Sequence, residues 1–71
     1  MDVLVFVTSV RDRKAVNRVQ PLLSSVPAIA QWNFDLEDCD HILRVVSDRL
    51  SPRKVESLLH SAGFDCYELE Y

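Results

Sequence analysis

The sequence predicts an α+β fold in which six elements follow one another as strand, helix, strand, strand, helix and strand. Three observations predict it: an apolar opening run, two stretches with apolar residues at helical spacing, and a middle stretch of strict alternation. Two right-handed crossovers fold this order into a ferredoxin-like βαββαβ sandwich, a four-stranded antiparallel sheet with two helices on one face. The predicted strand order is 4-1-3-2.

The first strand and the first helix occupy the opening third of the chain. Val3 to Thr8 is almost entirely β-branched or aromatic, which predicts a central strand that is apolar on both faces. Arg11 to Ser24 predicts a helix with Asp12 as its N-cap. Pro21 removes one backbone hydrogen bond, so a kink or an early end is expected there. Steps of three, four and three form the apolar stripe Val16, Val19, Leu23 and Val26.

The middle of the chain predicts a hairpin. Ala30, Trp32, Phe34 and Leu36 alternate with polar residues, which places these four side chains on one buried face of a strand. A polar tip follows at residues 37–40. Ile42 to Val46 returns as the third strand.

The last third predicts a helix and a final strand. Ser51 and Pro52 indicate a helix start, with a capping hydroxyl followed by proline at the first helical position. Gly63 indicates a left-handed helix end. The apolar stripe of this helix comprises Val55, Leu58, Leu59 and Ala62, and the final strand alternates through Tyr67, Leu69 and Tyr71.

Composition excludes several classes of protein. The 71 residues are 48% hydrophobic and 27% charged, which is typical of one globular domain spanning residues 1–71. A net charge of -3 argues against nucleic acid as a partner. The apolar opening run is too short for a signal peptide or a membrane span. We therefore expect a cytoplasmic protein with reduced thiols and no membrane insertion.

Several short motifs, taken in order, resemble the heavy-metal-associated (HMA, metallochaperone-like) domain family. Residues 26–29 (Val-Pro-Ala-Ile) are similar to the family's Leu-Pro-Gly-Val at the end of the first helix. Residues 32–37 are similar to its second strand, Val-x-Val-x-Leu. Residues 51–55 and 61–64 resemble its second helix and the Ala-Gly-Tyr exit. The resemblance covers nearly the whole chain and implies the same ferredoxin-like fold.

The metal loop of that family, Met-x-Cys-x-x-Cys, is where this sequence departs from the pattern. In the alignment Val10 takes the methionine position, while Asp12 and Ala15 take the two cysteine positions. Soft ions such as Cu(I) require thiolates, which a carboxylate and a methyl group do not replace. The sequence therefore predicts a degenerate metal site and no cofactor.

A basic segment occupies the position of the lost metal loop. Arg11, Arg13 and Lys14 flank Asp12 at the helix start, with Arg18 one turn further on. The resemblance places Phe64 at the family's loop aromatic. These residues are candidates for binding an anionic group or an acidic partner. The competing interpretation is a solvated charged face.

An acidic tip surrounds Cys39 and His41 in the predicted hairpin, and it could hold a divalent ion. Asp12 and Cys66 are the other weak candidates for ligands. The residue spacing of the acidic tip matches no defined metal-binding loop, and hairpin tips are normally polar. Cys39 and Cys66 are expected on opposite halves of the sheet, too far apart for a disulfide.

The sheet face without helices suggests a further contact surface. Val3, Val5 and Val7 point to one side of the first strand, with Ile42 or Val46 as neighbours. This face, or the edge strand around Trp32, is a candidate for a weak homodimer or a partner contact. The alternative is an apolar patch broken up by polar neighbours.

Two functions remain in competition. The first is a small non-enzymatic interaction or regulatory module that keeps the HMA scaffold without the ion. The second is a cation-binding domain that uses Asp12, Cys39 or His41. An enzyme ranks last: His60 has no predicted cleft around it, and the single glycine, Gly63, leaves no phosphate-binding loop before the first helix. We predict no catalytic residue.

Overall fold

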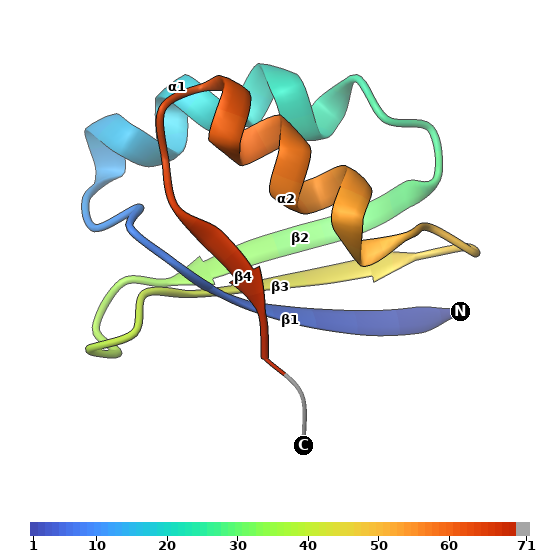
Figure 1. The fold of residues 1–71 in the computed structure, drawn as a ribbon, viewed down its shortest axis with the longest axis horizontal. Helices are drawn as coiled ribbons and strands as arrows, with labels where there is room; N and C mark the ends of the chain where they lie inside the picture. Colours follow the sequence, from blue (N-terminus) through green and yellow to red (C-terminus); the bar gives the residue numbers. More distant parts are fainter. Residues whose placement is uncertain (70–71) are drawn as a thin grey trace.

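A computed structural model describes residues 1–69 and has the predicted order of elements (Figure 1). Both helices lie on the same side of the sheet. Tyr71 of the predicted last strand lies outside the described residues. No helix within residues 1–69 has the length and apolarity to cross a membrane. The elements are β1 (Asp2–Thr8), α1 (Arg13–Ser24), β2 (Ile29–Asp35), β3 (Ile42–Ser47), α2 (Pro52–Ser61) and β4 (Cys66–Glu68).

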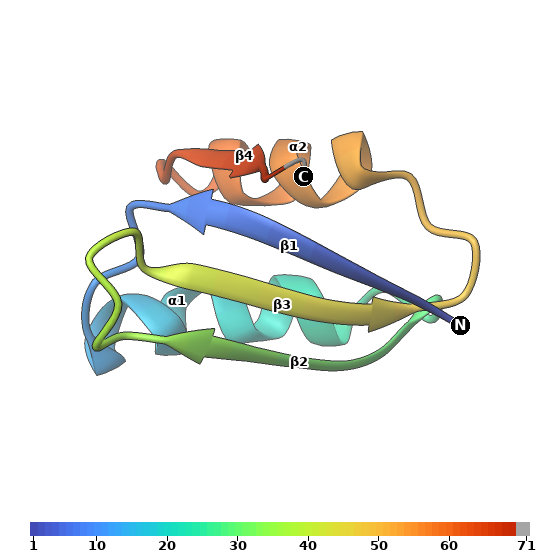
Figure 2. The same cartoon turned by 90° about the horizontal axis from the view of Figure 1, so that it is seen from below.

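The sheet has the order β2-β3-β1-β4 with antiparallel neighbours, which confirms the predicted arrangement (Figure 2). Phe6 of the central strand β1 lies opposite Leu43 on one side and Glu68 on the other. The core fills the space between the sheet and the helices. Its buried side chains are Phe6, Val10, Val16, Val19, Leu23, Leu43, Val45, Val55, Leu59 and Cys66.

Two details of the first half differ from the sequence prediction. Pro21 lies inside α1, and the helix continues to its predicted last residue, Ser24, so of the two expected effects of Pro21 the early end does not occur. Pro21 and Asn17 are both exposed, so water can satisfy the carbonyl group that the proline leaves without a partner. Ala30 is exposed, because a register shift between Ile29 and Gln31 adds an extra residue to β2 and turns this side chain outward.

The C-terminal end of α2 matches the prediction, whereas the N-terminal end matches it only in part. Ser51 precedes Pro52 as predicted, but its side chain makes no capping hydrogen bond. The C-terminal end is a Schellman motif, in which Gly63 adopts φ +90°. Its amide donates to His60 at 3.0 Å, and the Phe64 amide donates to Leu59 at 2.9 Å. This turn fixes where the Phe64 ring lies.

The helix-free face of the sheet is only partly exposed. Val3 is 62% exposed and Tyr67 is 58% exposed, whereas Val5 and Val7 are half-buried. Ile42, predicted to extend this face, is buried. The hairpin tip folds back onto the end of β1 beside it, where the Thr8 amide donates to the Asp40 carbonyl. Self-association through this face stays a prediction.

Side chains from α2 cover the free edge of β4. The amide of Glu68 donates to Glu56 Oε2 at 2.8 Å, and His60 Nε2 lies 3.1 Å from the Cys66 carbonyl oxygen. On the inner edge, the Leu69 amide donates to the Val5 carbonyl of β1, and the Asp65 carbonyl accepts from the Ser9 amide just after β1. Because successive residues of a strand direct their backbone groups to opposite edges, Cys66 and Glu68 face outward, and α2 satisfies one polar group of each.

Candidate functional site

Three connections meet at one end of the sheet, and Thr8 joins two of them. Its hydroxyl donates to the His41 carbonyl at 2.6 Å and accepts from the Val10 amide at 3.2 Å. Its own amide donates to the Asp40 carbonyl. The buried Thr8 side chain therefore ties the β1–α1 loop to the hairpin tip.

Ser9 ties the same loop to the segment before β4. The Ser9 amide donates to the Asp65 carbonyl at 3.1 Å, and the Asp65 amide donates to the Ser9 hydroxyl at 2.8 Å. The loop is thus held from both sides by hydrogen bonds to residues distant in the chain. Sequence analysis missed Thr8 and Ser9 as site-forming residues, although two hydroxyls between a strand and a helix are typical of such loop anchors.

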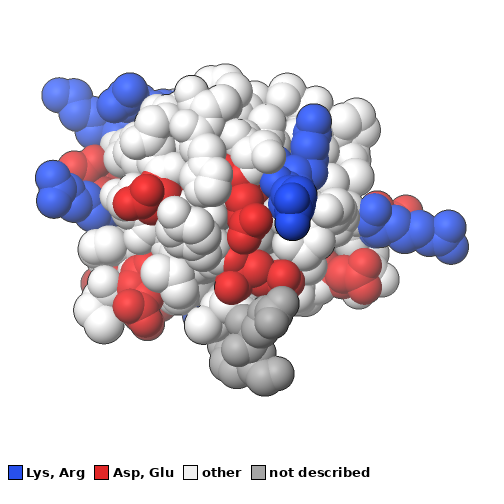
Figure 3. Space-filling model, in the orientation of Figure 1, with Lys and Arg blue, Asp and Glu red and all other residues white. Residues whose placement is uncertain are grey.

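A cleft of about 600 Å³ opens at this end of the molecule. It gathers the β1–α1 loop, the first turns of α1, the hairpin tip and the turn after α2. Figure 3 shows Lys and Arg side chains over the start of α1. The lining residues are Ser9, Arg11, Asp12, Lys14, Ala15, Arg18, His41, Gly63 and Phe64.

The cleft is positively charged. Three of its lining residues are cationic, and among the described residues Asp12 is its one carboxylate, which leaves a net charge of 3 − 1 = +2 with histidine neutral. Asp12 Oδ1 already accepts from the Ala15 amide at 2.8 Å, which confirms the predicted N-cap. The Arg18 guanidinium lies over the Phe64 ring, 5.4 Å from its centroid.

The positions aligned with the metal loop have other uses in this fold. Val10 is fully buried in the core, Asp12 caps α1, and Ala15 is half-buried against the core. Neither thiol lies in the loop. Cys39 is exposed and free on the hairpin tip, whereas Cys66 is free and buried. Burial raises the pKa of the Cys66 thiol to about 12, and the charge of Glu56 adds to the effect.

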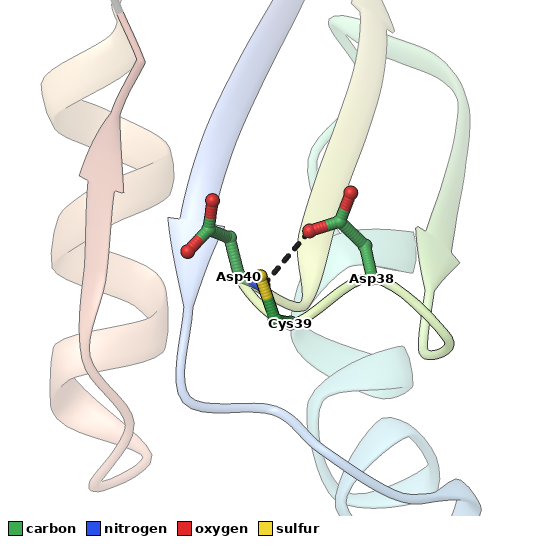
Figure 4. A group of neighbouring side chains, drawn as sticks. All are labelled: Asp38, Cys39 and Asp40. Carbon is green, nitrogen blue, oxygen red and sulfur yellow. Dashed lines mark hydrogen bonds between the residues drawn. The ribbon is translucent and has the colours of Figure 1, made fainter.

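The hairpin tip holds a separate cluster, Asp38, Cys39 and Asp40 (Figure 4). One ligand atom from each of these residues lies within 4.8 Å of the others. Asp38 Oδ1 also accepts from the Asp40 amide at 2.8 Å, so the cluster is stabilised as a turn. His41 follows with φ +47°, and its Nδ1 atom is buried without a hydrogen-bond partner among the described residues.

The predicted site residues therefore divide between two places. Arg11, Asp12, Lys14 and Phe64 line the same cleft. Arg13 lies on the other flank of α1, in a groove that it shares with Trp32 and Phe34 of β2. The ring of Trp32 packs edge to face with that of Phe34, at a centroid distance of 5.9 Å.

The fold places this chain among proteins of known structure. The yeast copper transporter domain Ccc2a, solved in apo and Cu(I)-loaded states, matches with a TM-score of 0.81 at 14% identity, over 96% of this chain and 94% of that domain. The N-terminal domain of ZntA in its apo form matches at 0.81 and 19% identity, over 96% and 92%. A chain of the Atx1–Cu(I)–Ccc2a complex matches at 0.79 and 14%, over 96% and 94%.

The chain has the ferredoxin-like fold of HMA domains, as the sequence motifs predicted. No protein-family model matches it, and no curated protein sequence matches it either. At such low identities the structural likeness defines the fold alone. Function must be argued from the residues of the cleft and the tip.

Proposed function

We propose that this protein is a non-enzymatic interaction module that retains the HMA scaffold and docks a partner protein at the end of the sheet where the metal loop would lie. Arg11, Asp12, Lys14 and Phe64 form the proposed docking surface in the cleft, and we propose that Arg13 extends it onto the other flank of α1. The observation that carries the proposal is the cleft itself, a cationic cavity with no thiol among its described lining residues. We propose further that the domain spans residues 1–71 and works in the cytoplasm.

The chemistry of the loop argues against a soft-metal site. Cu(I) is held by thiolates, and the aligned positions offer a carboxylate and a methyl group. Asp12 is already engaged with the Ala15 amide, so ligation of an ion by that oxygen would compete with the cap of α1. A cation would also meet the charges of Arg11, Lys14 and Arg18.

Rigidity of the loop favours protein recognition. Thr8 and Ser9 hold the loop by hydrogen bonds to the hairpin tip and to Asp65. A surface that is ordered before binding loses less conformational entropy when a partner docks. The similar fold of a chain in the Atx1–Cu(I)–Ccc2a complex is in keeping with a scaffold that assembles with another protein.

Titration with Cu(I) tests the loss of the soft-metal site. The purified reduced protein competes with a Cu(I) chelator of known affinity, and Cys39→Ser serves as the control for non-specific thiol binding. We expect no stoichiometric transfer of Cu(I) to the protein beyond what Cys39 alone explains. Tight capture at a ratio of about one ion per monomer by Cys39→Ser would contradict the proposal.

Site-specific cross-linking tests the docking surface. A photo-reactive amino acid replaces Lys14 in one variant and Lys54, in the first turn of α2, in a matched control. We expect a discrete adduct from position 14 and none of the same mass from position 54. The cross-linked protein is then purified, and its NMR footprint on the labelled domain must cover residues 11–18 and 63–64. A footprint elsewhere would disprove the proposed surface.

A second candidate function rests on the cluster at the hairpin tip. Asp38, Cys39 and Asp40 bring two carboxylates and a thiol close enough together to share a divalent ion such as Zn²⁺. This function predicts saturable NMR shifts in residues 36–41 on addition of Zn²⁺, lost in Asp38→Asn/Asp40→Asn. Shifts that stay linear in Zn²⁺ concentration would exclude it.

A further inference from the structure

The three cations of the cleft form one row that runs from the β1–α1 loop onto the first turns of α1. Lys14 and Arg18 are four residues apart, a spacing that places both side chains on one face of α1, and Arg11 lies in the loop just before the N-cap Asp12. All three line the cleft. A partner lying along this row would meet three positive charges in succession.

The two cations of this row that lie on α1, Lys14 and Arg18, lower the stability of that helix. Like charges four residues apart on a helix repel, as Lys14 and Arg18 do. Cations near a helix N-terminus also oppose its dipole, and the first turn of α1 holds no acidic residue. Asp12 is committed to the cap. The arrangement becomes favourable once an external anion occupies the cleft.

The remaining walls of the cleft add apolar surface. Ala15 and Phe64 offer apolar surface, and the Phe64 ring lies against Arg18. His41 lines the cleft from the hairpin tip, although its Nδ1 atom is buried and is not exposed to a ligand. The cleft therefore combines positive charge with an apolar wall.

The size of the cleft favours an extended ligand over a small ion. At about 30 Å³ per water molecule, 600 Å³ corresponds to about twenty waters, which a phosphate ion of five heavy atoms would not fill. The charge of the whole protein is -3, so the cleft is a positive region on an acidic molecule. Such a contrast steers an acidic ligand toward the cleft and away from the rest of the surface.

We propose that the cleft binds an acidic peptide segment of the partner. At least two carboxylates would pair with the row Arg11, Lys14 and Arg18, and a neighbouring apolar side chain would pack on Phe64. This inference rests on the proposed function and specifies the chemistry of its partner. It predicts which segments of a partner protein are recognised.

A peptide titration tests the inference. The probe is a fluorescent ten-residue peptide of alternating Glu and Asp around one central Leu, and its matched control carries Gln and Asn in place of the acids. We expect the acidic peptide to bind at least about tenfold more tightly than the neutral one, with NMR shifts at residues 11–18, 41 and 63–64. Binding should weaken steeply with salt.

Two charge-reversal variants locate the site. Arg11→Glu/Lys14→Glu should weaken binding at least about tenfold, whereas Arg53→Glu/Lys54→Glu, with the same charge change at the start of α2, should stay within about twofold of wild type. Circular dichroism checks that both variants fold. Equal weakening by both variants would reduce the effect to net charge and overturn the inference.

Other outcomes separate this inference from the proposed function. Equal binding of the neutral peptide, or no binding of either, would overturn the acidic ligand, while the cross-link at position 14 would still report docking at this end. A probe with phosphoserine in place of two acids, and inorganic phosphate alone, complete the series. If inorganic phosphate displaces the acidic peptide at equal concentration, the cleft is a small-anion site and the inference fails.

Discussion

The cleft and the outer edge of β4 both have helix side chains beside a strand, but they differ in whether the polar groups have partners within the protein. At β4, Glu56 accepts from the Glu68 amide and His60 lies within hydrogen-bonding distance of the Cys66 carbonyl. In the cleft, three cations share the lining with one carboxylate, which already accepts from the Ala15 amide. The polar groups at the edge of β4 are therefore paired within the protein, whereas the cations of the cleft remain available to a ligand.

This difference indicates which surface is open to a partner. An uncovered strand edge offers backbone groups to any other strand and so promotes unspecific association. At β4, Glu56 and His60, one turn apart on α2, contact these backbone groups in place of another strand. A positive cleft selects its ligand by charge and is repelled by other cations. The predictions below test whether the two regions really differ in this way.

The largest expected effect concerns the hydroxyl that holds the cleft together. Thr8→Val keeps the shape of the side chain but leaves the His41 carbonyl and the Val10 amide without their partner. Because each buried unsatisfied group costs about 1–3 kcal/mol, we expect a loss of about 3 kcal/mol in the free energy of unfolding, measured in urea. Thr8→Ser, which keeps the hydroxyl, should lose about 1 kcal/mol. Equal losses would show that Thr8 acts through packing alone.

The next effect concerns Cys66, which begins β4. Its thiol pKa is about 12 in the folded protein against 9.0 for an unperturbed cysteine. The folded state therefore keeps a proton that the unfolded state releases, so its contribution to stability is complete below pH 9 and is lost between pH 9 and about pH 12. We expect the free energy of unfolding to fall by up to about 1.4 kcal/mol per pH unit there.

Cys66→Ala provides the control for that slope, because other groups that titrate at alkaline pH are common to both proteins. The free energy of unfolding of wild type should therefore fall relative to that of Cys66→Ala above pH 9, so any advantage of wild type at neutral pH should shrink. A constant difference would mean that the buried thiol does not resist ionisation. Iodoacetamide should also modify the exposed Cys39 in the native protein, and Cys66 only after unfolding.

A smaller effect tests the cover of the β4 edge. Glu56→Ala removes the acceptor of the Glu68 amide, and we expect a loss of about 1 kcal/mol and an exchange rate of that amide raised about fivefold. Hydrogen exchange measured by NMR reports the rate. Glu56→Gln keeps a carbonyl acceptor and should exchange more slowly than the alanine variant. Equal exchange in the two variants would contradict the hydrogen bond.

Much of the fold follows from local patterns in the sequence. The apolar run at residues 3–8 predicts a strand with a neighbouring strand on each side, and it forms the central strand β1 between β3 and β4. Gly63 adopts a positive φ, a backbone conformation that residues with a side chain disfavour. Ala30 was wrongly placed on the buried face, since a bulge depends on how two strands pair and leaves no mark in the alternation of one strand.

The candidate site was only partly predictable for the same physical reason. The charges at residues 11–14 are visible in the sequence, but their meeting with Phe64 and His41 depends on contacts across the fold. Glu56 and His60 were not predicted to cover β4. Both flank the buried stripe of Val55 and Leu59, and the short connection after α2 places that flank beside the strand. Arg13 belongs to the basic segment in sequence and lines a different groove in space.

The smallest expected effect compares the starts of the two helices. Asp12 accepts from the Ala15 amide, whereas Ser51 makes no side-chain cap and relies on Pro52 at the first helical position. Asp12→Ala should therefore lower the free energy of unfolding by about 0.7 kcal/mol, and Ser51→Ala by a few tenths at most. The loss of the Asp12 carboxylate should at the same time tighten acidic peptide binding, because it raises the charge of the cleft. Urea denaturation and peptide titration on the same two variants measure both quantities. Weaker peptide binding in Asp12→Ala would mean that the cap positions the cations, and that its geometry matters more than its charge.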